Sequence, residues 1–199
     1  MKRRLALFLL ILAAGGAAAY YKLSAPPRPG PGEHLGIDVS AHQGSIDWPR
    51  VAADGVEFAY IKASEGGDWV DDHFARNWQG AGDAGLKRGA YHFFTLKRPG
   101  AEQAANFLRV APPDPDSLPP VVDLEFGGNS KERPDRKLVL GELKVFVDSV
   151  EKAHGRPIIL YLLPEFEARY QVRQVLVREI WLRNLGARPS HQEWRIWQY

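Results

Sequence analysis

Two acidic residues inside an apolar segment are the part of this sequence best suited to chemistry. Asp123 and Glu125 lie in the run PPVVDLEF, residues 119–126, whose apolar residues predict a buried strand. Side chains two apart on a strand leave the same face, with their Cα atoms about 6.5–7 Å apart. Burial and mutual repulsion both oppose ionisation, so the pKa of at least one of the two carboxyl groups should be raised.

Such a pair is suited to cleaving a glycosidic bond. A carboxylic acid that keeps its proton near neutral pH can protonate the leaving oxygen, while a second, ionised carboxylate supports the positive charge that develops on the sugar. We expect Glu125 to be the acid, because it has the longer side chain and lies nearer the strand end. Asp123 is expected to be its stabilising or orienting partner, with Asp38 approaching from an adjacent strand.

The same residues allow two other interpretations. Asp123 and Glu125 could cap a helix and carry a surface charge at the start of a loop. Carboxylates and a histidine could also bind Mg²⁺ or Ca²⁺ through oxygen ligands. The sequence gives the metal interpretation little support, because His42, His73 and His92 show neither HxxxH nor HExxH spacing.

Strand-like and helix-like segments alternate along the chain, which predicts right-handed crossovers and a parallel sheet. The fold class is therefore α/β, as a (β/α) barrel or an open doubly wound sheet. No GxGxxG or Walker pattern follows a strand, so a nucleotide site is not indicated. The expected strands are 35–40, 56–63, 88–95, 119–126 and 157–162, with short strands at 180–183 and 194–199. The expected helices are a short one opened by Asp47 and Pro49, and 71–84, 100–110, 134–154 and 165–170.

Composition narrows the class of protein. The chain has 199 residues, enough for one domain with a core. Five of its 26 Lys and Arg and none of its 24 Asp and Glu precede residue 31, so the remainder has a formal charge of −3. We therefore expect no nucleic-acid partner. The absence of cysteine excludes disulfides, thiol catalysis and cysteine-based zinc sites.

The first residues have the pattern of an export signal. Lys-Arg-Arg at 2–4 precedes an uncharged run at 5–21, which predicts a signal peptide or N-terminal membrane anchor over residues 1–23. Cleavage after Ala19 and retention as an anchor are both open. Residues 24–34 are expected to form a Pro/Gly-rich linker and residues 35–199 an exported domain, periplasmic or extracellular.

Taken together, these segments resemble the family 25 glycoside hydrolases, lysozymes that act as N-acetylmuramidases on peptidoglycan. The matching stretches, in order, are GIDVS (36–40), HQG (42–44), IDW (46–48), FAYIKASEG (58–66), GAYHFF (89–94), PPVVDLE (119–125), Trp181 and WQY (197–199).

The resemblance implies an irregular, TIM-barrel-like (β/α) barrel with five βα units and short closing strands. It implies hydrolysis of the β-1,4 bond between N-acetylmuramic acid and N-acetylglucosamine in peptidoglycan glycan strands, with no cofactor and no metal. Glu125 matches the family's general acid, and Asp123 and Asp38 match its supporting aspartates.

Other residues at the strand ends are expected to line a sugar groove. Those that can stack on sugar rings or donate hydrogen bonds to them are Tyr91, Tyr161, Trp181, Trp197, Lys62 and Gln198. Lys62 can instead neutralise the acidic cluster, with Glu65 as its ion-pair partner. Trp48, Trp69 and Trp78 are expected to pack between helices and barrel, and His92 to be a core histidine.

Members of the family usually continue past the WQY segment with a final strand that carries a further aspartate, whereas this sequence ends at Tyr199. The resemblance therefore implies a barrel that lacks its usual C-terminal strand. Two rival functions stay open: a non-catalytic glycan-binding protein that kept the groove, and hydrolysis of chitin or another β-1,4 hexosamine polymer.

Overall fold

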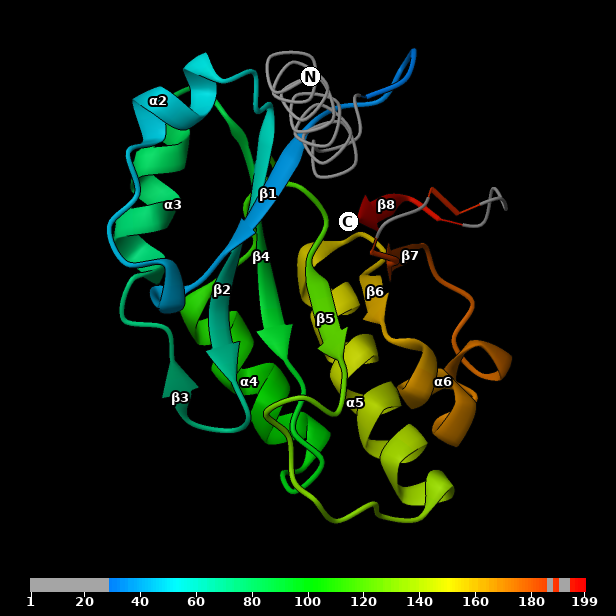
Figure 1. Ribbon diagram of the computed structural model, residues 1–199. Coiled ribbons are helices and arrows are strands. Elements are labelled where there is room, and N and C mark those ends of the chain that lie inside the picture. The colour runs from blue at the N-terminus through cyan, green and yellow to red at the C-terminus, as the bar shows by residue number, and fades with distance from the viewer. Residues whose placement is uncertain (1–28, 186–187, 190–193) are drawn as a thin grey trace, which may run out of the picture.

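The computed structural model describes residues 29–185, 188–189 and 194–199 (Figure 1). The signal or anchor predicted for residues 1–23 and the first part of the predicted linker lie outside the described residues. Among the described residues, no helix is both long and apolar enough to cross a membrane.

The elements follow the predicted alternation of strands and helices. The strands are β1 (Gly36–Val39), β2 (Phe58–Glu65), β3 (Trp69–Val70), β4 (Lys87–Phe93), β5 (Val121–Leu124), β6 (Ile159–Leu162), β7 (Ile180–Arg183) and β8 (Ile196–Gln198). The helices are α2 (Trp48–Ala53), α3 (Phe74–Asp83), α4 (Gly100–Val110), α5 (Arg136–His154) and α6 (Pro164–Tyr170), with short 3₁₀ turns at Ala41–Gln43 and Val172–Gln174.

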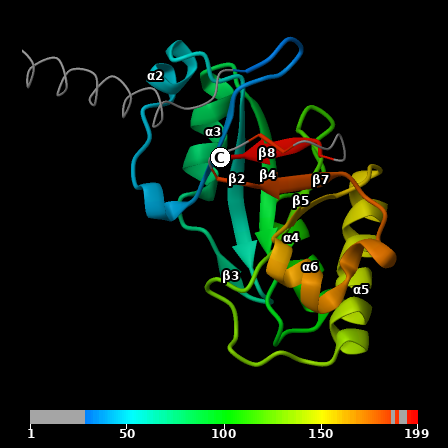
Figure 2. The same ribbon diagram turned by 45° about the vertical axis from the view of Figure 1, so that its right-hand side comes forward.

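The winding of the sheet decides between the two predicted folds. The main strands lie in the order β1-β2-β4-β5-β6-β7-β8, and each neighbouring pair is parallel. A doubly wound sheet would reverse direction at a switch point, but here the strands of this order follow one another in chain order, with only the short β3 set aside as an antiparallel partner of β2. Five βα units are followed by β7 and β8, and the sheet curls into a half-barrel with helices on its outer face (Figure 2). The predicted barrel is therefore confirmed.

Local sequence signals explain several of the helix ends. Asp47 caps α2 by accepting a 3.1 Å hydrogen bond from the amide of Arg50, and Gly155 ends α5 with a φ of 66°. Helix α3 begins three residues later than predicted. Asp71, expected in its first turn, instead accepts hydrogen bonds from the amides of Ala41 (2.8 Å) and His73 (2.9 Å), so it joins the loop after β1 to the start of α3.

Alternating side chains divide the apolar residues into two clusters. The larger cluster lies between the outer face of the sheet and the helices, with Phe107 and Phe146 fully buried in it. The smaller cluster fills the inside of the barrel and contains Tyr60, Val121 and Trp181. The inner residues nearer the carboxyl ends of the strands are polar, and these build the site.

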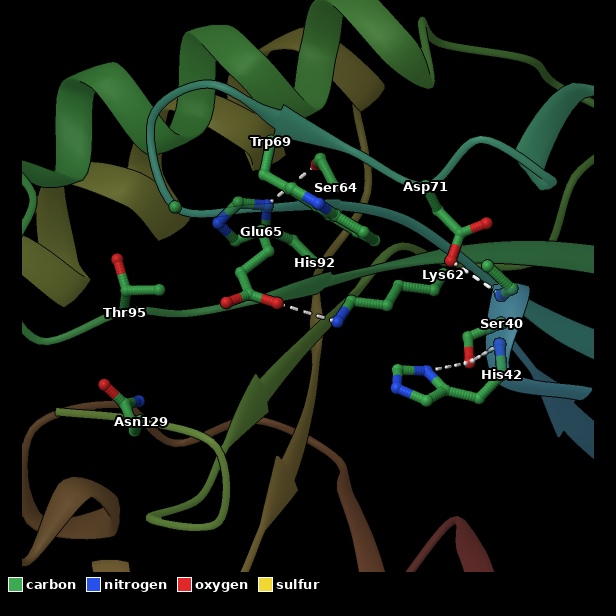
Figure 3. A network of polar contacts seen from close by, with 12 residues as sticks. Ser40, His42, Lys62, Ser64, Glu65, Trp69, Asp71, His92, Thr95 and Asn129 are labelled. Atoms are coloured by element: carbon green, nitrogen blue, oxygen red, sulfur yellow. Dashed lines mark hydrogen bonds and ion pairs between the residues drawn. The ribbon is translucent and has the colours of Figure 1, made fainter.

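A bulge in β2 sets which of its polar residues face inward. The pairing of β2 with β4 shifts between Lys62 and Ser64, so the strand carries one extra residue at Ala63. Ser64 consequently lies beside His92 on the outer side, where its Oγ is 2.8 Å from the His92 Nδ1 (Figure 3). Glu65 falls on the same side as Lys62, although the two are three residues apart.

Candidate active site

A cavity of about 180 Å³ opens at the carboxyl ends of the parallel strands. Most of the predicted site residues line it. The lining residues are Asp38, Tyr91, Val121, Asp123, Glu125, Tyr161, Trp181 and Gln198.

The register of the sheet brings these side chains to two neighbouring levels. Asp123 pairs with Tyr161 and Tyr161 with Trp181, so these three lie side by side, whereas Tyr91 pairs with Val121, one inward-facing position earlier. Because side chains alternate along a strand, Glu125 follows Asp123 on the same face. Both carboxyl groups open into the cavity, as the two-residue spacing predicts.

Burial raises the pKa of the Asp123 carboxyl group well above its ordinary value of 3.8. The neighbouring charge of Glu125 raises this pKa further, while the charge of Lys62 lowers it. The Oδ1 atom of Asp123 is buried and has no hydrogen-bond partner among the described residues. A buried acceptor without a partner costs about 1–3 kcal/mol of folding free energy, so this group is held for a purpose other than stability.

The other two acids are also poised toward the protonated form. Burial raises the pKa of Glu125, and the charge of Arg183 partly counteracts that rise. Burial likewise raises the pKa of Asp38, against a 2.9 Å hydrogen bond that its Oδ1 accepts from the Gln198 Nε2. The sequence predicts a raised pKa for at least one of Asp123 and Glu125, and burial is the largest cause of a raised pKa at both. The roles expected for the two residues, acid and stabilising or orienting partner, stay predictions.

Aromatic rings form the floor and wall of the cavity. Trp181 is only 5% exposed and contacts Tyr161 edge-on, with ring centroids 5.3 Å apart. Its indole Nε1 is buried and without a hydrogen-bond partner among the described residues. The Oε1 of Gln198 likewise has no hydrogen-bond partner in the part of the chain that the structure describes. The cavity therefore offers an indole donor and two acceptor oxygens to a polar ligand.

Lys62 lies beside the cavity rather than in its lining. Its Nζ is 2.9 Å from the Glu65 Oε2, and it lies 4.8 Å from the ring centroid of Trp69 and 5.0 Å from that of Phe93 (Figure 3). The expected pairing with Glu65 is confirmed. The ammonium group has three N–H donors, of which the ion pair with Glu65 uses one. The donor role of Lys62 toward a sugar therefore stays a prediction.

Two tryptophans occupy positions that differ from the expectation for them. Trp69 lies on β3 and is 43% exposed, so its expected packing between helix and barrel is wrong; the glycines before it, which form the β2–β3 turn, were the signal to the contrary. Trp197 is absent from the cavity lining, because it neighbours Gln198 on β8 and faces the other side. Its Nε1 donates a 3.0 Å hydrogen bond to the Asn184 carbonyl.

His92 and Arg183 lie on opposite faces of the sheet. His92 is fully buried on the outer face of β4 and bonded to Ser64, which confirms it as a core histidine. Arg183 lies two residues beyond Trp181 on β7, and sequence reasoning missed it although that spacing places it on the inner face.

In the part of the chain that the structure describes, no three His, Asp, Glu or Cys side chains gather to hold a metal ion.

Comparison with known proteins identifies the family. The family model described as "Glycosyl hydrolases family 25" matches residues 37–199. The chain belongs to this family. The structure of a family 25 glycosyl hydrolase from Bacillus anthracis is similar with a TM-score of 0.79 and 36% identity, covering 87% of this chain and 82% of that one.

The chain is also similar to two curated relatives, one of which is named as a muramidase. The uncharacterized protein YegX of Escherichia coli K12 is 36% identical over 172 residues, which cover 82% of this chain and 62% of YegX. The chain thus matches about three fifths of the length of that relative. The N,O-diacetylmuramidase of Arthroderma benhamiae is 28% identical over 141 residues, which cover 68% of this chain and 60% of the relative.

Proposed function

We propose that this protein is a lysozyme that hydrolyses the β-1,4 bond between N-acetylmuramic acid and N-acetylglucosamine in peptidoglycan. The observation that carries the proposal is the placement of Asp123 and Glu125 in one cavity, where burial raises the pKa of both carboxyl groups. Membership of family 25 and the similarity to a muramidase support the choice of substrate.

Glu125 is the proposed general acid. Its carboxyl is half-buried at the opening of the cavity, so it can reach a bound glycan while burial keeps its pKa raised. In the reaction it gives its proton to the leaving oxygen as the glycosidic bond breaks, and then takes a proton from the water that attacks the sugar.

Asp123 is the proposed orienting group. A nucleophile must be ionised, and burial disfavours that form of Asp123. A neutral carboxyl group can instead donate one hydrogen bond and accept others, which suits it to hold the acetamido group of the sugar beside the bond that breaks. Asp38 lies on β1 at the edge of the sheet, where the hydrogen bond from Gln198 favours its charged form against the effect of burial, and it is proposed to stabilise the positive charge on the sugar.

The aromatic side chains of the cavity are proposed to bind the sugar. Tyr91, Tyr161 and Trp181 present ring surfaces to the cavity, and the unpaired Nε1 of Trp181 can donate to a hydroxyl or carbonyl oxygen. Gln198 offers its free Oε1 as an acceptor. We further propose that the protein acts outside the cytoplasm, on the basis of the basic and apolar residues at 2–21.

The decisive experiment is digestion of purified peptidoglycan by the full chain, with release of reducing ends as the readout. We expect Glu125→Gln to lower turnover at least about a thousand-fold while the far-ultraviolet circular dichroism is unchanged, because the amide cannot donate a proton. The matched control is Glu132→Gln, an exposed glutamate outside the cavity lining, which should keep full activity.

Parallel digests of chitin oligosaccharides separate the substrate classes. Reducing ends from peptidoglycan alone support the proposal, and equal turnover of chitin contradicts the choice of a muramic acid bond. Binding to peptidoglycan without new reducing ends would identify the protein as a non-catalytic glycan-binding protein.

A further inference from the structure

The backbone at Glu125 lies just beyond the sheet that positions the rest of the site. Strand β5 ends at Leu124, whose pairing with Leu162 is the last in that ladder. Glu125 therefore begins a loop, which continues through Gly127 and Gly128, the latter with a φ of 72°. Two glycines give this loop little stiffness of its own, so the direction of the Glu125 side chain depends on contacts outside the ladder.

The side chain of Asn129 supplies the contacts to Glu125 itself, and its amide closes the loop with a 3.1 Å hydrogen bond to the Phe126 carbonyl. The Asn129 Nδ2 donates hydrogen bonds to the carbonyl of Glu125 (3.2 Å) and to the carbonyl of Phe94 (2.8 Å). Its Oδ1 accepts from the amides of Leu96 (3.1 Å) and Ser130 (2.9 Å). Both donor positions and both acceptor positions of the carboxamide are used, which fixes its orientation.

The loop to which Asn129 is tied is itself held firmly. Gln103, fully buried on α4, accepts a 2.8 Å hydrogen bond from the amide of Thr95 and donates to the carbonyls of Thr95 (3.0 Å) and Arg98 (2.9 Å). The segment after β4 thus has its amides and carbonyls bound on two sides, by Gln103 and by Asn129. Asn129 joins the free end of β5 to this rigid segment.

We infer that Asn129 is a positioning residue for the proposed general acid: its carboxamide holds the backbone at Glu125 so that the carboxyl group stays at the opening of the cavity. The inference rests on the proposed function, because it concerns the same acid. Asn129 has no part in the cavity lining and acts only through Glu125.

Loss of this tether has an effect that general loosening of the fold does not have. Glu125 would reach more water, and since burial is the largest cause of its raised pKa, that pKa would fall toward the ordinary value. The charged and titratable groups that face Glu125 are Asp123 of the same segment, Lys62 from β2, Tyr91 from β4, Tyr161 from β6, Arg183 from β7 and Glu165 from α6. Each stays on its own element in an Asn129 variant.

The test compares Asn129→Ala with Asn106→Ala in the full chain. Asn106 is a matched control, because its Nδ2 holds the carbonyls of Glu65, Gly66 and Trp69 and has no bond to Glu125. For Asn129→Ala we expect kcat on peptidoglycan to fall about ten- to a hundred-fold, with KM unchanged and the alkaline limb of the kcat profile at lower pH. Asn106→Ala should lower the melting temperature at least as much and leave the alkaline limb in place.

A second variant separates the two halves of the carboxamide. Asn129→Asp keeps an acceptor for Leu96 and Ser130 but cannot donate to Glu125, so it should lose activity as Asn129→Ala does. An unmoved alkaline limb in Asn129→Ala overturns the inference, as does the same shift in Asn106→Ala.

A measurement without turnover keeps the inference separate from the proposed function. The Glu125 carboxyl can be titrated by carbon NMR, with its signal identified by its loss in Glu125→Gln. If the wild-type protein releases no reducing ends, the proposed function fails, and this titration still decides the positioning role. A lower Glu125 pKa in Asn129→Ala supports it, and an identical pKa overturns it.

Discussion

Two buried ionisable residues on neighbouring strands show how differently the two faces of this sheet are used. His92 on the outer face of β4 pairs with Val122 of β5, one position before Asp123 on the inner face. Burial favours the neutral form of both groups, lowering the pKa of His92 to about 3 and raising that of Asp123. His92 has hydrogen-bond partners at both ring nitrogens, in Ser64 and Gln103, whereas one oxygen of Asp123 has none among the described residues.

The difference teaches how to separate a structural from a functional buried charge. The Gln103 Oε1 accepts from the Thr95 amide, so the His92 Nε2 must donate to it, and the Nδ1 then accepts from Ser64. Every polar atom of His92 is used within the fold. Asp123 lines the cavity and keeps an oxygen without a partner among the described residues, which is the arrangement expected of a group that awaits a ligand.

The largest expected effect concerns the inner face. Asp123→Asn should lower turnover of peptidoglycan by about a hundred- to a thousand-fold, since the amide nitrogen donates two hydrogen bonds and cannot accept those that the neutral carboxyl group accepts there. The melting temperature should stay the same or rise, because the amide cannot ionise and so avoids the cost of a buried charge beside Glu125. Reducing-end release and calorimetry on the same sample check both parts. Unchanged turnover would remove Asp123 from the mechanism.

The outer face should show the opposite pattern. His92→Leu leaves Ser64 and Gln103 without a buried partner, so we expect the free energy of unfolding to fall by about 2–4 kcal/mol. Below the melting temperature kcat should change little. The matched control is His34→Leu, at an exposed histidine whose side chain is 64% accessible, and it should cost little stability. Denaturant titration gives these values, and a stable but inactive His92 variant would contradict the distinction.

The pH dependence of stability should separate the two groups by sign. The folded-state pKa of Asp123 lies above its unfolded value of 3.8, so its contribution is lost as pH rises from about 3.8 through the folded pKa. The folded-state pKa of His92, about 3, lies below its unfolded value of 6.5, so its contribution is lost as pH falls between those values. We expect the unfolding free energy, measured across this pH range, to lose the Asp123 dependence in Asp123→Asn and the His92 dependence in His92→Leu.

The smallest expected effect lies at the edge of the site. Trp69 is exposed beside Lys62, where its ring can stack on a bound glycan. Loss of the ring should therefore raise KM about two- to five-fold without changing kcat. Trp69→Ala is measured against Val177→Ala, at an apolar residue 83% exposed and outside the cavity lining. A fall in kcat for Trp69→Ala would show that the ring acts through Lys62 and Glu65 instead.

Local patterns predicted most of the fold. Asp47 and Gly155 mark helix ends by short-range chemistry, and the predicted limits of α4 agree with the structure. The two-residue spacing of Asp123 and Glu125 was enough to place both in one cavity, because strand alternation needs no knowledge of the partner strands.

Features set by distant contacts could not be predicted. The start of α3 depends on a bond from Asp71 to an amide 30 residues away. The bulge near Ser64 exists because β2 pairs with β4 in a particular register, and that register puts Glu65 beside Lys62. Asn129 escaped notice for the same reason, since its partners belong to two different loops.

The hydrogen bond between Gln198 and Asp38 spans 160 positions of the chain and joins the first strand to the last described one. During synthesis Asp38 leaves the ribosome long before its partner exists. Every earlier intermediate, however well its helices have formed, therefore lacks one side of the proposed active site, and we expect hydrolytic activity only after β8 has docked.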